Sequence, residues 1–327
     1  MSLPVCSDCF KGTLRGDVIP TGREDVIHGL PTYVAEPEWH QKSLGTVVLI
    51  TDAFGWSLRN TRALADAYAK RVPCTVYVPD FMDGKAIPLS VMAPLEAQRD
   101  PNSSRILQIL KRTWAFVKVV PVFLLWLYRT RPSIAWPRVR AFLAAERSKT
   151  TGLSGGPPKI GVAGFCWGGL FAVGLTNTNN PDNWATLGGG KKVPLIDVAF
   201  TAHPSMLKLP KHIEEVELPL SLANGENDSF MGEKKMKEVQ RILEEKSRKA
   251  ANGADASRGS GPDNFALPDT HQVVVYPGAK HGFAVRGDRD DPWQKQRGEE
   301  AEDQAVRWFK AWFTAQRVQD FPIASAP

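Results

Sequence analysis

The chain has few cysteines, too few for a disulfide scaffold. They are Cys6, Cys9, Cys74 and Cys166, in 327 residues. So low a count excludes the small disulfide-stapled folds and fits a reducing compartment. The opening stretch MSLPVCSDCF also has neither a basic n-region nor an apolar h-region, so it predicts no secretion signal. We therefore expect a cytoplasmic protein.

The two N-terminal cysteines lack companions. Cys6 and Cys9 have the two-residue spacing of redox and metal-binding pairs, but no second pair of ligands accompanies them and they precede the first predicted strand. Zinc sites built on this spacing need four ligands. We predict no metal site and no redox role for this stretch.

Long apolar runs are also missing. The most apolar stretch, WAFVKVVPVFLLWLY at 114–128, is 15 residues long and contains Lys118 and Pro121. A helix that spans a bilayer needs about 20 apolar residues. The run therefore predicts no membrane span, and it leaves open a lid or an anchor that lies on a membrane surface.

Acidic residues are nearly absent from one segment. The formal charge of the chain is +6, yet residues 101–150 carry ten Lys or Arg against one acid, so this segment is +9 and the remainder is −3. No zinc-finger spacing, RNP-like aromatic motif or recognition-helix pattern accompanies the charge. We predict no nucleic-acid partner, and a weak membrane-surface contact through 105–149 stays open.

What the chain does contain is an alternation of strand and helix patterns. Its length and 43% hydrophobic content suit one large core, so we expect a single domain over 1–327. A hairpin at 26–36 precedes the series. Alternation of this kind favours an α/β fold, with a mostly parallel sheet flanked by helices on both faces. The predicted strands are 46–50, 74–80, 159–165, 196–202, 218–225 and 271–278, and the predicted helices are 59–71, 168–175, 232–249 and 298–316.

Two stretches interrupt this alternation. Residues 250–270 are rich in Gly, Ala, Ser, Pro and Asp and predict a flexible loop. Residues 90–150 predict a basic helical insertion at the carboxyl edge of the sheet. We expect it to form a cover, or lid, beside the active site; the alternative is a solvated amphipathic segment packed elsewhere. The side chains expected to wall a pocket are Trp114, Phe116, Phe123, Leu124 and Trp126.

The motif GFCWG at 164–168 places Cys166 between glycines where a strand runs into a helix. The nucleophile elbow G-x-S-x-G has this arrangement, with flanking glycines that let other backbone pass close to the turn. A helix N-terminus also favours a thiolate. The alternative is a buried structural cysteine, since free cysteine is among the most buried residue types.

Two later residues favour catalysis. Asp228 follows the strand in LPLSLANGENDSF, and His281 follows the strand in HQVVVYPGAKHGF. An isolated Asp in a turn is usually a turn former and an isolated loop His is usually solvated. Here the chain order nucleophile, acid, histidine is that of elbow-type hydrolases, which indicates a triad of Cys166, Asp228 and His281.

The motifs GFCWGG, NGENDSF and YPGAKHGFAVR resemble the dienelactone hydrolase (carboxymethylenebutenolidase-like) family of α/β-hydrolases, over roughly 20–90 and 155–315. The resemblance implies Cys166 as nucleophile, His281 as general base and then acid, and Asp228 as the residue that orients the imidazole. It also implies a small-molecule ester or lactone substrate, cleavage through a thioester intermediate, and no metal or organic cofactor.

The chemistry of the residues agrees with this reading. We expect the backbone N–H groups of Ala53 and Trp167 to form the oxyanion hole. A thiolate is itself easily expelled from a tetrahedral intermediate, so esters and lactones are favoured over peptides.

The chain departs from the family pattern around the expected substrate site. Asp52 stands where the family usually has a Glu, and a cap on the following turn is an equally good interpretation. The two family arginines are replaced by Gly84, beside Lys85, and by Val285, beside Arg286. The small anionic substrate of the bacterial enzymes is therefore not assumed. The expected substrate-binding residues are Asp52, Phe54, Trp126, His203 and Arg286; for His203 a solvated or capping role is the alternative.

Two rival functions remain at this point. One is a binding or regulatory protein that keeps the fold without turnover, against which the intact triad argues. The other is a membrane-surface protein that uses the basic insertion. The sequence leaves the substrate and the oligomeric state open.

Overall fold

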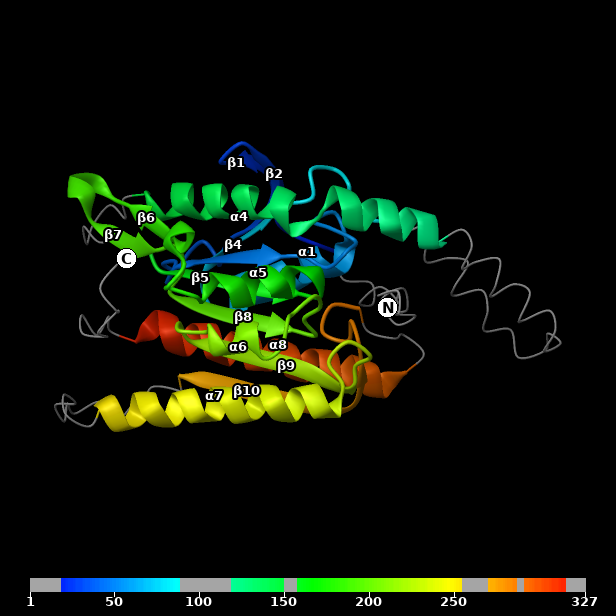
Figure 1. Ribbon diagram of the computed structural model, residues 1–327. Helices are drawn as coiled ribbons and strands as arrows, with labels where there is room; N and C mark the ends of the chain where they lie inside the picture. The colour runs from blue at the N-terminus through cyan, green and yellow to red at the C-terminus, as the bar shows by residue number, and fades with distance from the viewer. Residues whose placement is uncertain (1–18, 89–118, 150–157, 255–269, 287–290, 316–327) are drawn as a thin grey trace.

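The centre of the protein is one eight-stranded sheet (Figure 1). The structure is a computed structural model and describes residues 19–88, 119–149, 158–254, 270–286 and 291–315. The strand order is β1-β2-β4-β3-β5-β8-β9-β10, with β1 and β2 antiparallel and the other six strands parallel to one another. The strands are β1 Arg23–Ile27, β2 Leu30–Ala35, β3 Thr46–Ile50, β4 Thr75–Pro79, β5 Ile160–Phe165, β8 Val198–Ala202, β9 Leu220–Asn227 and β10 His271–Lys280.

The middle strands are buried on both faces, as their sequences predict. Every residue of β3, β5 and β8 is buried, because continuous runs of Val, Ile, Leu, Ala and Phe suit a strand covered from both sides. Parallel pairing aligns Val48 with Val162 and Ala163 with Phe200. The carboxyl ends of these strands therefore meet at one edge of the sheet.

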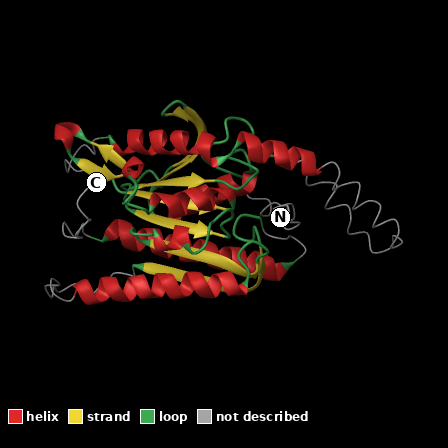
Figure 2. Cartoon of the chain, viewed as in Figure 1, coloured by secondary structure: helices red, strands yellow, loops and turns green. Residues whose placement is uncertain are grey.

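Helices cover both faces of the sheet (Figure 2). Helices α1 and α8 pack against each other on one face, and α4, α5, α6 and α7 lie on the other. Their bounds are α1 Arg59–Arg71, α4 Pro132–Arg147, α5 Trp167–Leu175, α6 Lys211–Glu214, α7 Glu233–Ala254 and α8 Pro292–Thr314. The predicted alternation of strands and helices and the mostly parallel sheet are thus confirmed.

The differences from prediction are local. Helix α8 begins at Pro292, capped by the Asp291 side chain, six residues before the predicted start. Residues 250–254 belong to helix α7 rather than to a loop, and 255–269 lie outside the described residues. A small sheet of β6 Trp184–Thr186 and β7 Lys192–Pro194 was not predicted, because three residues carry too little periodicity to indicate a strand.

The insertion is helical where it is described. Residues 119–129 form a helix, here called the insertion helix, that is followed by α4. Residues 89–118, with Trp114 and Phe116, lie outside the described part of the chain, as do Cys6 and Cys9. Within the described ranges, no helix combines the length and the apolarity that crossing a bilayer requires.

Candidate active site

Cys166, Asp228 and His281 come from three turns that follow β5, β9 and β10. Since these strands are parallel, their carboxyl ends bring the three turns to the same edge of the sheet. All three side chains are buried. The predicted triad residues therefore lie together in the fold.

The turn at Cys166 has the tight geometry of an elbow. The backbone of Cys166 has φ 51° and ψ −110° and leads directly into α5. The N–H of Gly168 donates to the carbonyl of Thr51 (3.1 Å), and a Cβ on Gly168 would collide with the carbonyl of Ile50. A Cβ on Gly164 would likewise collide with the carbonyl of Gly168. Glycines are required at both positions because the backbone of α5 touches β3 at Gly168 and β5 at Gly164.

Asp228 is fixed through both carboxylate oxygens. One oxygen, Oδ2, lies 2.8 Å from Nδ1 of His281. The other, Oδ1, accepts the backbone N–H groups of Phe230 (2.8 Å) and Met231 (3.2 Å). With its acceptor sites occupied by the imidazole and by backbone, Asp228 fixes the ring orientation of His281 and leaves Nε2 to the reacting side.

The imidazole of His281 packs edge to face between two other rings. Its centroid lies 4.8 Å from that of Phe230 and 5.0 Å from that of His203. Burial lowers the pKa of His281, but the Cys166 and Asp228 side chains outweigh burial and raise that pKa above its ordinary value. An imidazolium held in this way stabilises an adjacent thiolate.

His203 was expected to line the pocket, and this expectation was wrong. Its side chain is fully buried behind His281 and is absent from the pocket lining. Burial, followed by the charges of His281 and Arg286, lowers the pKa of His203 well below its ordinary value. His203 is therefore a neutral ring that supports His281 and does not reach a substrate.

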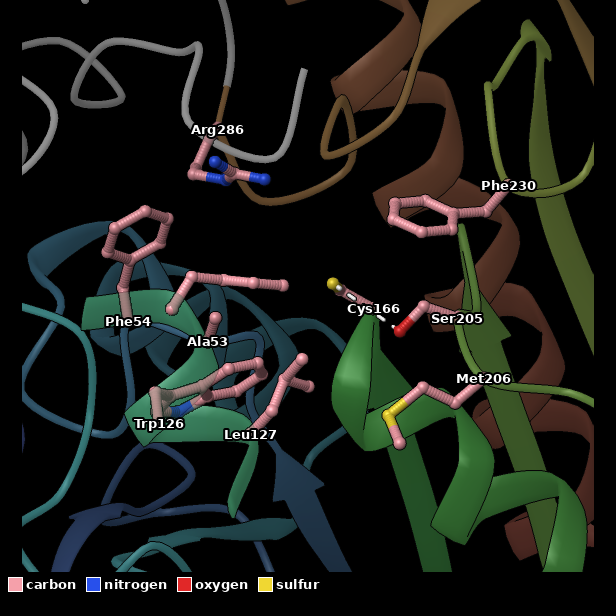
Figure 3. A pocket seen from close by; sticks show the side chains of 10 residues that line it. Ala53, Phe54, Trp126, Leu127, Cys166, Ser205, Met206, Phe230 and Arg286 are labelled. Atoms are coloured by element: carbon pink, nitrogen blue, oxygen red, sulfur yellow. Dashed lines mark hydrogen bonds between the residues drawn. The ribbon is translucent and has the colours of Figure 1, made fainter. Parts of the chain in front are cut away.

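A cavity of about 250 Å³ opens beside the sulfur of Cys166 (Figure 3). Most of the lining side chains are apolar, and they come from the turn after β3, the insertion helix, and the turns after β5, β8, β9 and β10. The cavity is lined by Ala53, Phe54, Phe123, Trp126, Leu127, Cys166, Ser205, Met206, Phe230 and Arg286.

Ser205 is the nearest polar neighbour of the sulfur in this lining, and sequence reasoning missed it. Its Oγ lies 3.8 Å from Sγ of Cys166 (Figure 3), and its backbone N–H donates to the carbonyl of Cys166 (2.9 Å). The signal was present in the stretch TAHPS, where the turn after β8 offers two polar side chains. Sequence reasoning chose His203 from this pair, whereas Ser205 is the one that faces the cavity.

Comparison with known proteins identifies the family of the chain. The family model of the dienelactone hydrolase family matches residues 30–252 and 266–313. The chain belongs to the dienelactone hydrolase family. Hydrolase tropI of Talaromyces stipitatus is 27% identical over 316 residues, and hydrolase pyvD of Aspergillus violaceofuscus is 24% identical over 312; each match covers 95% of this chain and 98% of the relative.

A solved structure supports the fold independently. A dienelactone hydrolase structure from Klebsiella pneumoniae superimposes with a TM-score of 0.52 at 18% identity, covering 88% of this chain and 98% of that one. The α/β-hydrolase fold implied by the sequence motifs is therefore confirmed. As a family member, the chain is a hydrolase of the dienelactone hydrolase type.

The two expected oxyanion donors flank the cavity in this dienelactone hydrolase family member. Trp167 is the first residue of α5, where a backbone N–H has no partner within its own helix. Ala53 lies in the turn after β3 and lines the cavity. The indole of Trp167 is buried and donates to the carbonyl of Thr130 (3.1 Å), so its side chain is already engaged within the fold.

Asp52 caps the turn after β3 and pairs with Arg286. Its Oδ1 caps the turn by accepting the N–H of Phe54 (3.0 Å), and its Oδ2 lies 3.1 Å from Nε of Arg286. The guanidinium of Arg286 also lies over the ring of Phe54, 5.0 Å from the centroid. Burial raises the pKa of Asp52 above its ordinary value and Cys166 adds to the rise, whereas Arg286 opposes it. An arginine keeps its charge in proteins, and the 3.1 Å contact pairs that charge with the buried carboxyl group.

The insertion helix supplies one wall of the cavity. Phe123, Trp126 and Leu127 face inward, and the indole N–H of Trp126 points to the sulfur of Met82 (3.5 Å). Leu124 was expected in this wall, but it is 43% exposed on the outer face. A helical turn of 3.6 residues explains the difference, because residues 123, 126 and 127 share a face that 124 does not.

Proposed function

We propose that this protein cleaves carboxylic esters or lactones with Cys166 as the nucleophile. The observation that carries the proposal is geometric: Cys166 stands on a tight turn beside the cavity, and His281 is held through Nδ1 by Asp228 at 2.8 Å at the same edge of the sheet. Cys166 and Asp228 also raise the pKa of His281 in spite of its burial. An imidazolium next to a thiol on an elbow is the resting arrangement expected of a cysteine nucleophile.

The proposed reaction begins with attack of the Cys166 thiolate on the acyl carbon. The carbonyl oxygen becomes an oxyanion, which accepts hydrogen bonds from the backbone N–H groups of Ala53 and Trp167. His281 gives its proton to the leaving oxygen as the C–O bond breaks, which leaves a thioester on Cys166. The neutral imidazole then takes a proton from water, and the resulting hydroxide attacks the thioester and releases the acid.

Asp228 acts through His281 in this scheme. Its hydrogen bond to Nδ1 favours the ring orientation and the tautomer that present Nε2 to the sulfur and to the leaving group. Ser205 lies within reach of Sγ and is suited to hold the sulfur by a hydrogen bond during both half-reactions. We also propose that the inward side chains of the insertion helix limit the size of the substrate, since they form a wall of the cavity.

The test is an activity panel of lactones and aryl esters, with Cys166→Ala as the control. We expect turnover by the wild type, none above background by Cys166→Ala, and an acyl adduct on Cys166 by mass spectrometry after rapid quenching. A burst of thioester without a second phase would favour the binding or regulatory alternative. Turnover that survives in Cys166→Ala would refute the cysteine mechanism.

A further inference from the structure

We infer that the pocket selects an uncharged, apolar acyl ester or lactone and discriminates against a substrate that carries a free carboxylate. The inference rests on the proposed function, because it concerns the substrate of the same site. It comes from the charge balance of the cavity: among the lining residues that the structure describes, the one charged side chain is Arg286, and it is already paired with the buried carboxyl group of Asp52.

The lining offers an anion little to bind. Of the ten described lining side chains, six are aromatic or long aliphatic groups, namely Phe54, Phe123, Trp126, Leu127, Met206 and Phe230. An ionised carboxylate that leaves water for such surroundings loses its hydration and needs a charged or hydrogen-bonding partner in return. An uncharged acyl group loses no such hydration and gains contact with the walls.

Among the described lining residues, Arg286 is the one that could supply a charged partner, and its charge is engaged from behind. Asp52 lies 3.1 Å from Nε, and both side chains are at most 2% exposed. The ring of Phe54 covers a face of the same guanidinium. A buried arginine in this position is held by its carboxylate, because removing one partner of a buried pair leaves an uncompensated charge.

A substrate carboxylate at Arg286 would bring a second anion to a site that already contains Asp52. It would also lie in the same cavity as the Cys166 thiolate, since both residues line it. Like charges at such separations raise the free energy of the bound state in a region of low dielectric constant. Both effects weaken binding and attack for an anionic substrate and are absent for a neutral one.

The experiment compares two 4-nitrophenyl esters whose acyl chains end in a neutral methyl ester or in a free carboxylate, methyl 4-nitrophenyl succinate and mono-4-nitrophenyl succinate. We expect kcat/KM of the wild type to favour the neutral methyl ester at least tenfold. Equal values, or a preference for the free carboxylate, would overturn the inference. If neither ester is cleaved, the proposed function fails. The charge selection is then decided by a second comparison, the protection of Cys166 from iodoacetamide by the neutral N-methylphenylacetamide and by the anionic phenylacetate.

The variant Asp52→Asn tests the cause of the selection. It releases the charge of Arg286, so the ratio of kcat/KM for the neutral ester to that for the anionic ester should fall by about tenfold relative to the wild type. The matched control is Asp83→Asn, which removes a carboxylate that is 58% exposed and paired with Lys85 and should leave the ratio unchanged. An unchanged ratio in Asp52→Asn would overturn the role of the ion pair. If this variant does not fold, the ratio of the two kcat/KM values in the wild type decides the inference.

Discussion

Two cysteines of this protein are buried to nearly the same extent and differ in almost everything else. Cys74 is 0% exposed and Cys166 is 5% exposed. Cys74 lies between the end of α1 and the start of β4, at the amino edge of the sheet, whereas Cys166 lies between the end of β5 and the start of α5, at the carboxyl edge. Cys74 thus lies at the C-terminal end of a helix, and Cys166 lies at the N-terminal end of another.

The ends of the two helices have opposite electrostatic effects. The thiol of Cys74 donates to the carbonyl of Tyr68 in the last turn of α1 (3.8 Å), and burial raises its pKa. The negative end of a helix dipole also disfavours a thiolate. Cys166 instead precedes the positive end of α5 and acts on the imidazole of His281. Burial alone therefore disfavours a thiolate, whereas helix polarity together with a cationic neighbour is the arrangement by which we propose that Cys166 is activated.

The largest expected effect comes from removing each sulfur in turn. Cys166→Ser and Cys166→Ala should each lower kcat for an activated aryl ester by about 10³-fold or more. The serine hydroxyl is much less acidic than a thiol, and alanine has no nucleophile at all. Cys74→Ala should keep kcat within about twofold of the wild type, since no reacting group is lost. Steady-state kinetics measures both, and full turnover in both Cys166 variants would end the distinction between the two cysteines.

The second prediction concerns the groups that activate Cys166. His281→Ala removes both proton transfers, whereas Asp228→Asn misorients the imidazole, so the loss of kcat for His281→Ala should equal or exceed that for Asp228→Asn. Each loss should be on the order of 10²- to 10⁴-fold. The same ester and assay serve for both variants. If His281→Ala were fully active, His281 would not be the base of the reaction.

The third prediction concerns the rates at which iodoacetamide labels the two cysteines at different pH values. The pKa of His281 is raised, so its imidazolium persists to higher pH than that of a free histidine and continues to support a thiolate at neutral pH. Iodoacetamide should therefore label Cys166 about 100-fold faster than Cys74 at pH 7. In His281→Ala the labelling of Cys166 should slow at pH 7 and recover only as the pH rises. Peptide mass spectrometry of timed samples measures both rates, and identical pH profiles in wild type and variant would remove His281 from the explanation.

The smallest expected effect is on stability, and it reverses the ranking of the two cysteines. Cys74→Ala leaves a void in a closed core and should lower the free energy of unfolding by about 1 kcal/mol. Cys166→Ala enlarges a cavity that already exists, so it should cost less. Urea unfolding followed by circular dichroism measures the difference. A larger loss at Cys166 would mean that its sulfur contributes to the core as well as to the reaction.

The sheet and the triad could be predicted from the sequence because their signals are local. Continuous apolar runs predict buried strands, and Cys166, Asp228 and His281 each follow such a run directly. Parallel strands then bring these turns to one edge. The phase of the insertion helix could not be predicted in the same way. Residues 119–128 contain no charged side chain, so no polar face indicates that Leu127 points inward and Leu124 outward.

Contacts between turns that are far apart in the sequence could not be predicted either. Asp52 and Arg286 belong to turns at opposite ends of the chain, and nothing in their local patterns shows that they meet. The choice between His203 and Ser205 depended on which way one turn after β8 faces. Such choices are made by tertiary packing, which a local pattern does not contain.

The contact between α5 and β3 also has a consequence for how this family member tolerates change over evolution. Every coded side chain at position 168 would meet the carbonyl of Ile50, so a scan of all substitutions selected only for soluble expression should deplete Gly168 as strongly as a scan selected for turnover. Cys166 should tolerate replacement in the first scan and not in the second. The fold thus constrains Gly168, and the proposed reaction constrains Cys166 two residues before it. Only the two selections together can distinguish these constraints.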